Sequence, residues 1–352
     1  MRHASRMTSK NPSLPVLAYV LLEAKKGAVV ARATNIDVAY EALVPSRVEK
    51  EGVVAVFGPA LASFLSGVSS QNVSFSAGAG GFLVRAGNAQ ATFKVFPHED
   101  FPTFSHPKDS ANHLSATDLL LGLKSVLYSA SVSSIRPELS SIYIFSDGNG
   151  VVFVATDSFR LAEKQVAAQK NVSIPPTLLP AKNAAELLRI LMEMEKEPCA
   201  VGSLHGQFTV EGGGVLFTSR VVDGTFPDYK QIIPKEFVTT VTILKEDFLK
   251  ALQLISGLSE KSNQILIAVP KGGGEVVLSV KNAEVGEGTS KLAAAISGEP
   301  FEMSFNARYL IDCLQAITEP SVSLLFSGAA KPLVVTGAGN ASFRYIVMPM
   351  NR

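Results

Sequence analysis

The chain contains three similar stretches, Ala91-Thr-Phe-Lys-Val-Phe-Pro97, Phe217-Thr-Ser-Arg-Val-Val-Asp223 and Ala341-Ser-Phe-Arg-Tyr-Ile-Val-Met-Pro349. When they are aligned, Lys94, Arg220 and Arg344 coincide, at separations of 126 and 124 residues (220 − 94 and 344 − 220). A second pair, Ala33-Thr34-Asn35 and Ala155-Thr156-Asp157, lies 122 residues apart (155 − 33). This period is the length of one ordinary domain, which predicts three tandem copies of a domain and not a short-repeat solenoid.

The third copy shows the predicted composition of one repeat most clearly. Apolar residues at helical spacing predict helices over 245–258 and 305–317, with Asn306 as a good N-cap. Apolar runs between turn residues predict strands at 241–244, 264–270, 275–281, 292–297, 321–326, 332–337 and 341–349. Each copy is therefore predicted to be mostly antiparallel sheet with two helices covering one face, an α+β fold.

The other two copies follow the same order. In the second copy, Thr117-Asp118 is predicted to cap a helix that runs to residue 128. The remaining predicted elements are strands at 141–146, 151–156 and 161–168 with a helix at 181–195, and, in the first copy, strands at 16–23, 29–34 and 39–45 with a helix at 59–68. Prolines and glycines after the last strands place boundaries near His106 and Pro234. The predicted domains are therefore 1–105, 106–234 and 235–352.

The first copy begins late relative to the other two. Subtracting the repeat length from Leu119, in the first helix of the second copy, gives a position before residue 1. Residues 1–9 are therefore expected to hold only the end of that helix. We expect an upstream start codon or a truncation. The alternative is a first domain that lacks one helix and one strand and exposes apolar surface.

The composition indicates a globular protein whose positive and negative charges nearly balance. Hydrophobic residues make up 47% of the chain and charged residues 18%, enough for a core in every third. The net charge of +1 excludes a histone-like basic tail but leaves nucleic-acid binding open, because clustering of charge creates a binding field. No apolar run reaches the length of a membrane span. Cys199 and Cys313 are expected to be buried thiols in a reducing cytosol, with a disulfide as the alternative.

Motifs that carry catalysis are missing from the sequence. There is no phosphate loop, and 271–274 reads as a hairpin turn. The five histidines show no metal-ligand spacing. Asp157 and Asp223 are interpreted as turn or capping carboxylates. No catalytic residue, metal site or cofactor is expected.

Several segments together resemble one family. They are Asn11-Pro-Ser-Leu-Pro-Val-Leu17, Ala155-Thr-Asp-Ser-Phe-Arg-Leu-Ala162, Val222-Asp-Gly-Thr-Phe-Pro-Asp-Tyr229, Phe305-Asn-Ala-Arg-Tyr309 and Tyr345-Ile-Val-Met-Pro-Met350. In order and spacing they resemble the bacterial DNA polymerase III β subunit, the sliding clamp. None of these segments would be specific alone.

The resemblance implies a fold, a role and a set of partners. Each domain would carry two helices and two small sheets, and two chains would join head to tail into a ring around double-stranded DNA. The ring would be a non-enzymatic, cytoplasmic processivity factor, associated with the nucleoid during replication. It would bind the replicative DNA polymerase, the clamp loader and repair proteins through short linear motifs. Tethering raises the effective concentration of a polymerase without a catalytic group.

The family's peptide-binding pocket lies between domains two and three. The matching positions here are Leu139, Thr156, Arg160, Leu161, Pro234, Asn306, Tyr309, Val347, Met348, Pro349 and Met350. Methionines adapt to several ligands, and Arg160 can anchor a carbonyl or carboxylate. The alternative is that Met348 and Pro349 only finish a core strand. Ser158-Phe159 replaces the family's common Gly-His, and the chain ends in Asn351-Arg352 where a basic-then-apolar ending is common, so peptide preference is expected to differ.

The resemblance also implies DNA contacts and a dimer seam. It places Lys182 in a loop before the second helix of domain two and Arg136 in the loop after the first. Lys10 lies near a DNA-contacting loop of domain one, although Asn11 stands where a basic residue is expected. Further candidates for DNA binding are the helix-borne residues Lys124, Arg189 and Lys250, each with a plain solvated side chain as the alternative. The seam candidates are Phe93, Leu254 and Ile255, and the last two could equally be core.

Two rival functions remain at this stage. The first is a clamp-like scaffold that binds partner peptides but does not close on DNA, because its first domain is incomplete. The second is a hydrolase or transferase on an α+β scaffold, which metal-dependent turnover would reveal.

Overall fold

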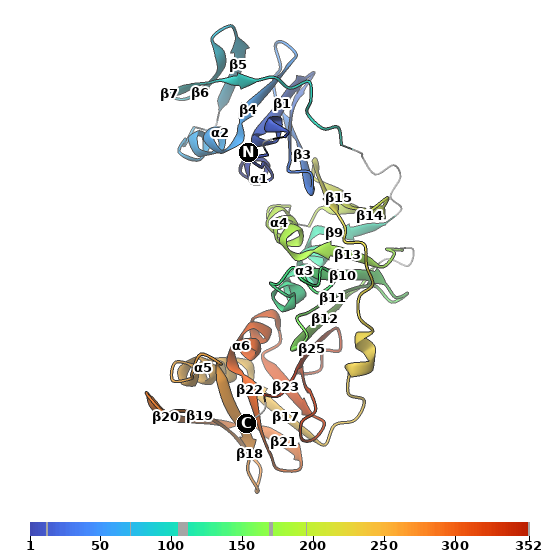
Figure 1. The fold of residues 1–352 in the computed structure, drawn as a ribbon, viewed down its shortest axis with the longest axis vertical. Helices are drawn as coiled ribbons and strands as arrows, with labels where there is room; N and C mark the ends of the chain where they lie inside the picture. The colour runs from blue at the N-terminus through green and yellow to red at the C-terminus, as the bar shows by residue number, and fades with distance from the viewer. Residues whose placement is uncertain (12, 71, 105–111, 169–171, 195, 351–352) are drawn as a thin grey trace. The chain divides into compact units, whose positions relative to one another are not determined.

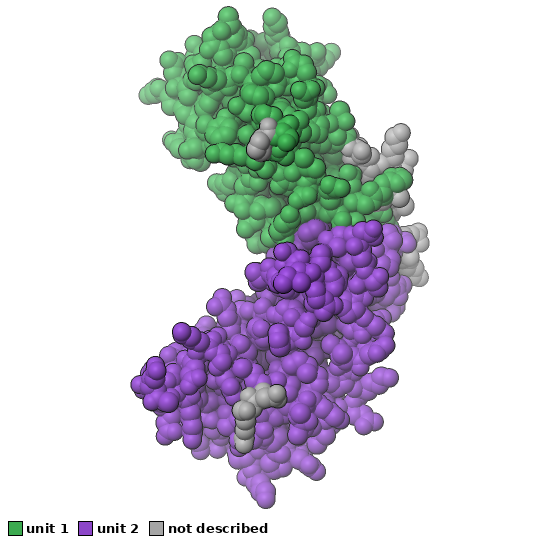
Figure 2. Space-filling model, viewed as in Figure 1, with its two compact units in different colours: residues 1–119, 182–221 green, residues 120–181, 222–352 purple. Residues whose placement is uncertain are grey.

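The computed structural model describes residues 1–11, 13–70, 72–104, 112–168, 172–194 and 196–350 (Figure 1). The chain forms two compact units, shown in different colours in Figure 2. The first unit comprises Met1–Leu119 and Lys182–Val221, and the second comprises Leu120–Ala181 and Val222–Arg352. The boundary predicted near His106 lies outside the described residues.

The first unit is built from three α-helices, a short 3-10 helix (Pro15–Ala18) and twelve strands among its described residues. In chain order they are α1 (Arg2–Arg6), β1 (Tyr19–Lys25), β2 (Ala28–Thr34), β3 (Val38–Pro45), β4 (Gly52–Phe57), α2 (Gly58–Ser66), β5 (Val73–Gly78), β6 (Gly81–Ala86), β7 (Ala89–Phe93), β8 (Val95–Phe96), β9 (His113–Ser115), α4 (Ala181–Leu191), β14 (Pro198–Leu204), β15 (Gln207–Gly212) and β16 (Val215–Arg220). A nine-stranded sheet has the order β8-β4-β1-β2-β3-β16-β15-β14-β9, and β5-β6-β7 forms a separate sheet.

The second unit contains the remaining elements. They are α3 (Ala116–Val126), which begins in the first unit, then β10 (Ser141–Ser146), β11 (Val151–Thr156), β12 (Arg160–Val166), β13 (Thr177–Pro180), β17 (Thr239–Leu244), α5 (Lys245–Ser256), β18 (Gln264–Val269), β19 (Glu275–Asn282), β20 (Gly286–Ala293), β21 (Ala295–Gly298), β22 (Phe301–Asn306), α6 (Ala307–Ala316), β23 (Ser321–Phe326), β24 (Leu333–Gly337) and β25 (Phe343–Val347). Its sheets have the orders β13-β10-β11-β12-β25-β24-β23-β17-β21 and β20-β19-β18-β22.

Both nine-stranded sheets cross from one repeat into the next. In the first unit, β3 of the first repeat pairs antiparallel with β16 of the second, with Val38 opposite Ser219. In the second unit, β12 of the second repeat pairs in the same way with β25 of the third, with Arg160 opposite Val347. The second repeat therefore contributes strands to both sheets, which is why the compact units divide it.

The helices bury the apolar stripe that their sequence predicts. α5 buries Phe248, Leu252 and Ile255, three or four residues apart on one face. α6 likewise buries Leu310 and Leu314. None of the described helices is long and apolar enough to cross a membrane.

Two predicted helix starts have different outcomes. Asn306 is the N-cap of α6, and its side chain accepts hydrogen bonds from the backbone N–H groups of Arg308 and Tyr309, as predicted. The cap predicted at Thr117-Asp118 is wrong, because Ser115 Oγ accepts from the Asp118 N–H at 3.0 Å and donates to its carboxylate. A serine ahead of the first apolar turn is an equally good cap and moves the start by two residues.

Several predicted boundaries are corrected by strand pairing. The strand predicted at 292–297 is divided between β20 and β21, which belong to different sheets. The helix predicted from residue 305 begins at Ala307, because Phe305 and Asn306 end β22, which the sequence did not reveal. β22 pairs with β18 through Ile265 and Phe305. Pairing between distant strands competes with local helical spacing here.

Candidate functional site

The seam between β12 and β25 organises the candidate peptide site. Arg160 lies opposite Val347, and Leu161 lies opposite Ile346. Successive side chains of a strand point to opposite faces, so each face receives alternate pairs from this seam. The candidate residues therefore divide into two groups, one on each face.

Arg160 belongs to the helix-covered face. Its Nε lies 2.9 Å from Asp157 Oδ2, and its Nη1 lies 2.8 Å from Asp312 Oδ2 on α6. The guanidinium also stacks over the Tyr309 ring, 4.3 Å from its centroid, and lies 5.7 Å from that of Tyr128. Only 11% of the Arg160 side chain is exposed.

The surroundings of Arg160 keep its guanidinium protonated and balance its positive charge with two carboxylates. Burial alone would lower its pKa, but the hydrogen bond from Arg160 to Asp312 and the negative charge of Asp157 raise the pKa above its ordinary value. Because two carboxylates already pair with Arg160, it braces the second repeat against the third. The idea that Arg160 anchors a partner carboxylate stays a prediction, and these pairs would weaken such an anchor.

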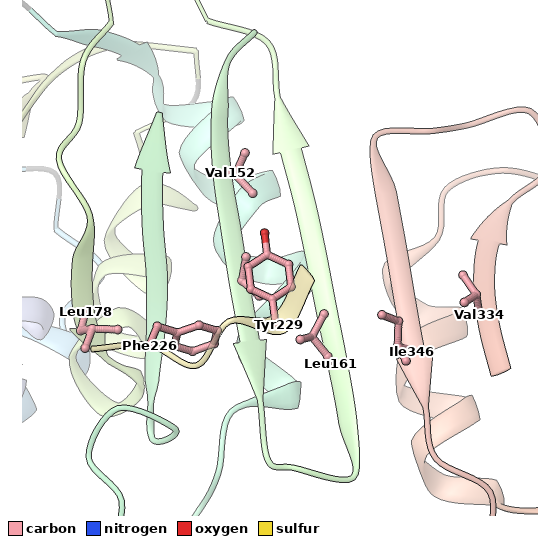
Figure 3. Close-up of a cluster of buried hydrophobic side chains, with 8 residues drawn as sticks. Val152, Leu161, Leu178, Phe226, Tyr229, Val334 and Ile346 are labelled. Atoms are coloured by element: carbon pink, nitrogen blue, oxygen red, sulfur yellow. The ribbon is translucent and has the colours of Figure 1, made fainter. Parts of the chain in front are cut away.

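The opposite face carries a buried apolar cluster. Figure 3 shows Tyr229, from the connector after the second repeat, in front of the strands that carry Val152 and Leu161. Phe226 of the same connector lies beside it and stacks on Tyr143 of β10. Ile346 of β25 belongs to the same cluster. Burying each large side chain of this kind stabilises a fold by about 1.5–3 kcal/mol. The connector thus fastens the second and third repeats together.

Three interacting polar side chains, those of Tyr229, Glu163 and Arg344, continue the same face. Tyr229 donates its hydroxyl hydrogen bond to Glu163, and Arg344 Nη1 lies 3.2 Å from Glu163 Oε1. Burial and the hydrogen bond to Glu163 raise the pKa of Tyr229. The residues are in register, since Glu163 lies opposite Arg344. The connector is held by both packing and hydrogen bonds.

Because side chains alternate between the two faces of β25, Val347 and Ile346 have different roles from those the sequence predicted. Val347 pairs with Arg160, lies on the helix-covered face and is fully buried. Ile346 shares a face with Leu161 and the connector, and the sequence reasoning did not include it. Counting back in steps of two from Met348 would have found Ile346. Leu139, Leu161 and Val347 are all buried, so they support the surface from beneath.

The exposed part of the site is the end of the chain and its neighbours. Met348 donates its N–H to the Phe159 carbonyl at 2.9 Å, and Met350 donates its N–H to the Ser304 carbonyl at 2.8 Å. These bonds hold the terminal segment between the second and third repeats. Pro234, Asn306, Tyr309, Pro349 and Met350 are partly exposed around it.

The turn before β12 is built from side-chain hydrogen bonds. Asp157 Oδ1 accepts from the N–H groups of Phe159 and Arg160 at 2.9 and 3.0 Å. Thr156 donates its hydroxyl to the Arg160 carbonyl at 2.7 Å. Asp157 is therefore a turn carboxylate, as predicted.

The remaining candidates for a chemical role are metal ligands, the two cysteines and a hollow beside α5. Among the residues that the structure describes, no three His, Cys, Asp or Glu side chains gather as metal ligands. Cys199 and Cys313 are free, buried thiols, which confirms the expectation and excludes a disulfide between them. A hollow of about 390 Å³ beside α5 is lined by Leu244, Asp247 and Pro320, and none of the peptide candidates lines it.

Comparison with known protein families finds matches along nearly the whole chain. Models of the DNA polymerase III beta subunit match in order: its N-terminal domain over residues 1–105, its central domain over 114–228 and its C-terminal domain over 230–351. The chain belongs to the DNA polymerase III beta subunit family. It is a DNA sliding clamp, a non-catalytic processivity factor, and the predicted three-domain α+β fold is confirmed.

Individual relatives agree over nearly their full length. The chain is 28% identical over 358 residues to the beta sliding clamp of Caulobacter vibrioides strain NA1000, covering 99% of this chain and 95% of the relative. It is also 28% identical over 357 residues to the beta sliding clamp of Synechococcus elongatus, covering 98% and 94%.

Solved structures share the fold. The beta subunit from Thermotoga maritima gives a TM-score of 0.91 at 22% identity, covering 99% of this chain and 95% of that one. A Pseudomonas aeruginosa sliding clamp bound to griselimycin gives a TM-score of 0.91 at 25% identity, covering 100% and 96%.

The six basic residues proposed for DNA binding in the clamp are all exposed. Lys182 lies in the first turn of α4 and not in a loop, which corrects the sequence prediction. Four of the six are paired with acidic neighbours: Lys182 with Asp37, Arg136 with Glu138, Arg189 with Glu186 and Lys250 with Glu246. Such pairs are weak at exposed positions and can exchange for phosphates.

The residues predicted for the dimer seam of the clamp differ in how far they are buried. Leu254 is 73% exposed on α5, whereas the adjacent Ile255 is only 2% exposed and packs in the core. Phe93 is half-buried at the end of β7, where its ring meets Phe64 edge-on at 6.0 Å. The core alternative therefore holds for Ile255, and the seam hypothesis is carried by Leu254 and Phe93.

Proposed function

We propose that this clamp encircles duplex DNA as a head-to-tail homodimer and tethers partners through a peptide-binding surface between its second and third domains. The partners would be the replicative DNA polymerase, the clamp loader and repair proteins, which bind through short linear motifs in the cytoplasm. The proposed domains span 1–105, 106–234 and 235–352. The observation that carries the peptide surface is the partly exposed segment Met348–Met350, whose backbone is held by hydrogen bonds to Phe159 and Ser304.

The peptide surface has suitable chemistry. Met348 and Met350 offer polarizable, adaptable side chains on a backbone held by two hydrogen bonds. Tyr309 is a partly exposed aromatic residue whose ring carries the Arg160 guanidinium on one face, and its backbone carbonyl accepts from the Tyr345 hydroxyl at 2.9 Å. A fixed backbone with adaptable side chains lets one site take several related peptides.

Ring closure is supported by the strand edges. β3 is the last of three consecutive paired strands, β1-β2-β3, and β12 is the last of β10-β11-β12. Each of the two pairs with the last long strand of the next repeat, β16 or β25. The corresponding strand of the third repeat is β20, the last of β18-β19-β20, and β7 is the last long strand of the first repeat. Among the described strands, β20 and β7 each have a neighbour on one side only. A second copy of the chain would pair these edges in the same way and close a ring.

The basic residues fit sliding better than tight binding. A ring holds DNA by topology, so strong base contacts would pin it. Lys10, Lys124, Arg136, Lys182, Arg189 and Lys250 would make screened phosphate contacts that exchange as the ring moves. The acidic partners of Arg136, Lys182, Arg189 and Lys250 weaken those four contacts further.

The peptide surface is tested by fluorescence anisotropy of a labelled peptide of the Gln-Leu-x-Leu-Phe type. The titration compares the intact chain with a deletion of residues 348–352. We expect micromolar binding by the intact chain and its loss in the deletion, while circular dichroism shows the fold retained. Equal binding by both proteins would place the site elsewhere.

A further inference from the structure

The seam between β3 and β16 in the first unit ends in the same way as the seam between β12 and β25. The N–H of Arg220 donates to the Asp37 carbonyl at 2.8 Å, one pair beyond the last residues in register. In the β12–β25 seam, the N–H of Met348 donates to the Phe159 carbonyl at the same place. The end of the β3–β16 seam therefore repeats the backbone arrangement found beside the proposed peptide surface.

The turn that leads into this seam is repeated as well. Thr34 donates its hydroxyl to the Val38 carbonyl at 2.7 Å. Asn35 Oδ1 accepts from the N–H groups of the second and third residues after it, at 3.1 and 2.9 Å. Thr156 and Asp157 make the same hydrogen bonds in the turn before β12. Both turns are therefore fixed before any ligand arrives, and little ordering is needed on binding.

Ile36 is the exposed apolar residue of the first turn. It is 48% exposed, and its φ is +78°, a left-handed conformation that is rare for a β-branched residue. Strained backbone of this kind persists only where the surrounding structure fixes it, and it occurs often at ligand-binding positions. Ser158 has the same conformation in the other turn, with a φ of +79°. The first turn thus presents an apolar side chain where the other presents a small polar one.

The two residues that end the β3–β16 seam are charged. Asp37 stands where the other seam has Phe159, and Arg220 stands where it has a methionine. The Asp37 carboxylate is already paired with Lys182, with Oδ2 and Nζ 2.8 Å apart. Arg220 is exposed, and no carboxylate among the described residues forms an ion pair with it. The seam end therefore carries an unpaired positive charge next to the apolar side chain of the turn.

We propose that Ile36 and Arg220 form a second docking surface, which binds an extended acidic segment of a partner protein. A carboxylate of the segment pairs with Arg220, and a neighbouring large aliphatic side chain packs on Ile36. Lys182 neutralises Asp37, which would otherwise repel the segment. DNA phosphates could use the charge of Arg220 but not the apolar side chain, so the pair favours a peptide. Its backbone model is the proposed peptide surface, so the two surfaces are tested separately.

The test uses labelled peptides of equal length that alternate Glu with Leu, Gln with Leu, or Lys with Leu. Fluorescence anisotropy gives Kd at about 50 mM salt, where exposed charges are weakly screened. Excess unlabelled Gln-Leu-x-Leu-Phe-type peptide occupies the proposed surface between the second and third domains. The proteins are the wild type, Arg220→Gln, Ile36→Ser and the control Arg47→Gln. Arg47 is a matched control because it is an arginine of the first domain whose side chain is 92% exposed.

We expect the wild type to bind the Glu-Leu peptide about fivefold to tenfold more tightly than the Gln-Leu peptide, and the Lys-Leu peptide most weakly. Arg220→Gln should reduce the first difference to about twofold or less. Ile36→Ser should weaken binding of the Glu-Leu and Gln-Leu peptides by the same factor, about threefold or more, because only apolar contact is lost. Arg47→Gln should match the wild type.

Three results would overturn the second docking surface. They are a charge preference that survives Arg220→Gln, equal binding of the Glu-Leu peptide by Ile36→Ser and the wild type, and no binding of any alternating peptide. Weaker binding of duplex DNA by Arg220→Gln with unchanged peptide binding would assign Arg220 to DNA instead. Failure of the Gln-Leu-x-Leu-Phe-type peptide to bind would overturn only the proposed surface between the second and third domains.

Discussion

Arg160 and Asp312 form an ion pair, with Nη1 and Oδ2 2.8 Å apart, although 152 residues separate them in the chain. Arg160 starts β12 of the second repeat, and Asp312 lies on α6 of the third. The same guanidinium holds Asp157, which shapes the turn that carries Phe159. One side chain thus joins the domain seam to the rim of the peptide surface.

Removing Asp312 should weaken this seam. Asp312→Ala leaves Arg160 with one carboxylate, and losing a hydrogen bond to a charged group costs about 1.5–3 kcal/mol. We expect a fall of that size in the free energy of unfolding, measured by urea titration, with weaker peptide binding by anisotropy. The exposed Glu246, 3.8 Å from Lys250, provides the control Glu246→Ala, which should change neither. Indistinguishable results for the two variants would remove Arg160 as a brace.

Lys182 should contribute to DNA binding in a salt-dependent way. Its Nζ lies 2.8 Å from Asp37 Oδ2, so the two possible roles, phosphate contact and ion pair, are separable. Lys182→Gln should lower the affinity for duplex DNA more at about 50 mM salt than at about 200 mM. Asp37→Asn breaks the same pair but frees the amine, and should leave the affinity equal or higher. If both variants lose affinity alike, Lys182 acts only through Asp37.

Leu254 should belong to the dimer seam. Because its side chain is exposed in the single chain, Leu254→Asp should leave the fold intact and shift sedimentation velocity toward the monomer. Met192→Asp, at an exposed apolar position on the other unit, is the matched control. A dimer of unchanged stability in Leu254→Asp would place the seam elsewhere. A wild-type monomer at all concentrations would favour the scaffold that does not close on DNA.

The cysteines should be inert in the folded protein. Burial, with a smaller effect of the Glu197 charge, raises the pKa of Cys199 to about 11, and burial raises that of Cys313 well above its ordinary value. At pH 8 both groups are therefore thiols, and the reactive thiolate is scarce. A thiol-disulfide reagent should label neither residue until denaturant unfolds the chain. Fast labelling of the native protein would contradict the burial of both groups.

Gly122 should tolerate no larger residue. A methyl group there would overlap the ring of Phe153, which is fully buried on β11. Gly122→Ala should lower the free energy of unfolding by about 1–3 kcal/mol, despite the better helix propensity of alanine. Gly257→Ala, at the end of α5, is the control, since the nearest atom to its new methyl would be the Leu254 carbonyl oxygen at 3.8 Å. A stabilised Gly122→Ala would show that α3 can move away from β11.

Local sequence predicted much of the fold for a physical reason. The stripe of Phe248, Leu252 and Ile255 predicts α5, and the structure ends that helix at Ser256, two residues before the predicted end. Asn306 was recognised as a cap because its chemistry is local. The repeat was visible at Lys94, Arg220 and Arg344 because these residues stand at or directly after the last long strand of each repeat, β7, β16 and β25.

Long-range pairing could not be predicted in the same way. The pairing of β12 with β25 decides that Ile346 and not Val347 shares a face with Leu161, and no local pattern contains that register. The ion pair of Lys182 with Asp37 likewise depends on where two repeats meet. From the sequence, Leu254 and Ile255 could each belong to the dimer seam or to the core. Their burial distinguishes them, because Leu254 is exposed and Ile255 is buried.

The most direct test of topological binding compares circular and linear DNA. The clamp is loaded by its own clamp loader onto nicked circular plasmid, and the complex is separated from free protein by gel filtration. We predict that the clamp elutes with the circular DNA and is released when one restriction cut makes the plasmid linear. Equal retention on the linear plasmid, or none on the circle, would contradict a ring that holds DNA by encircling it.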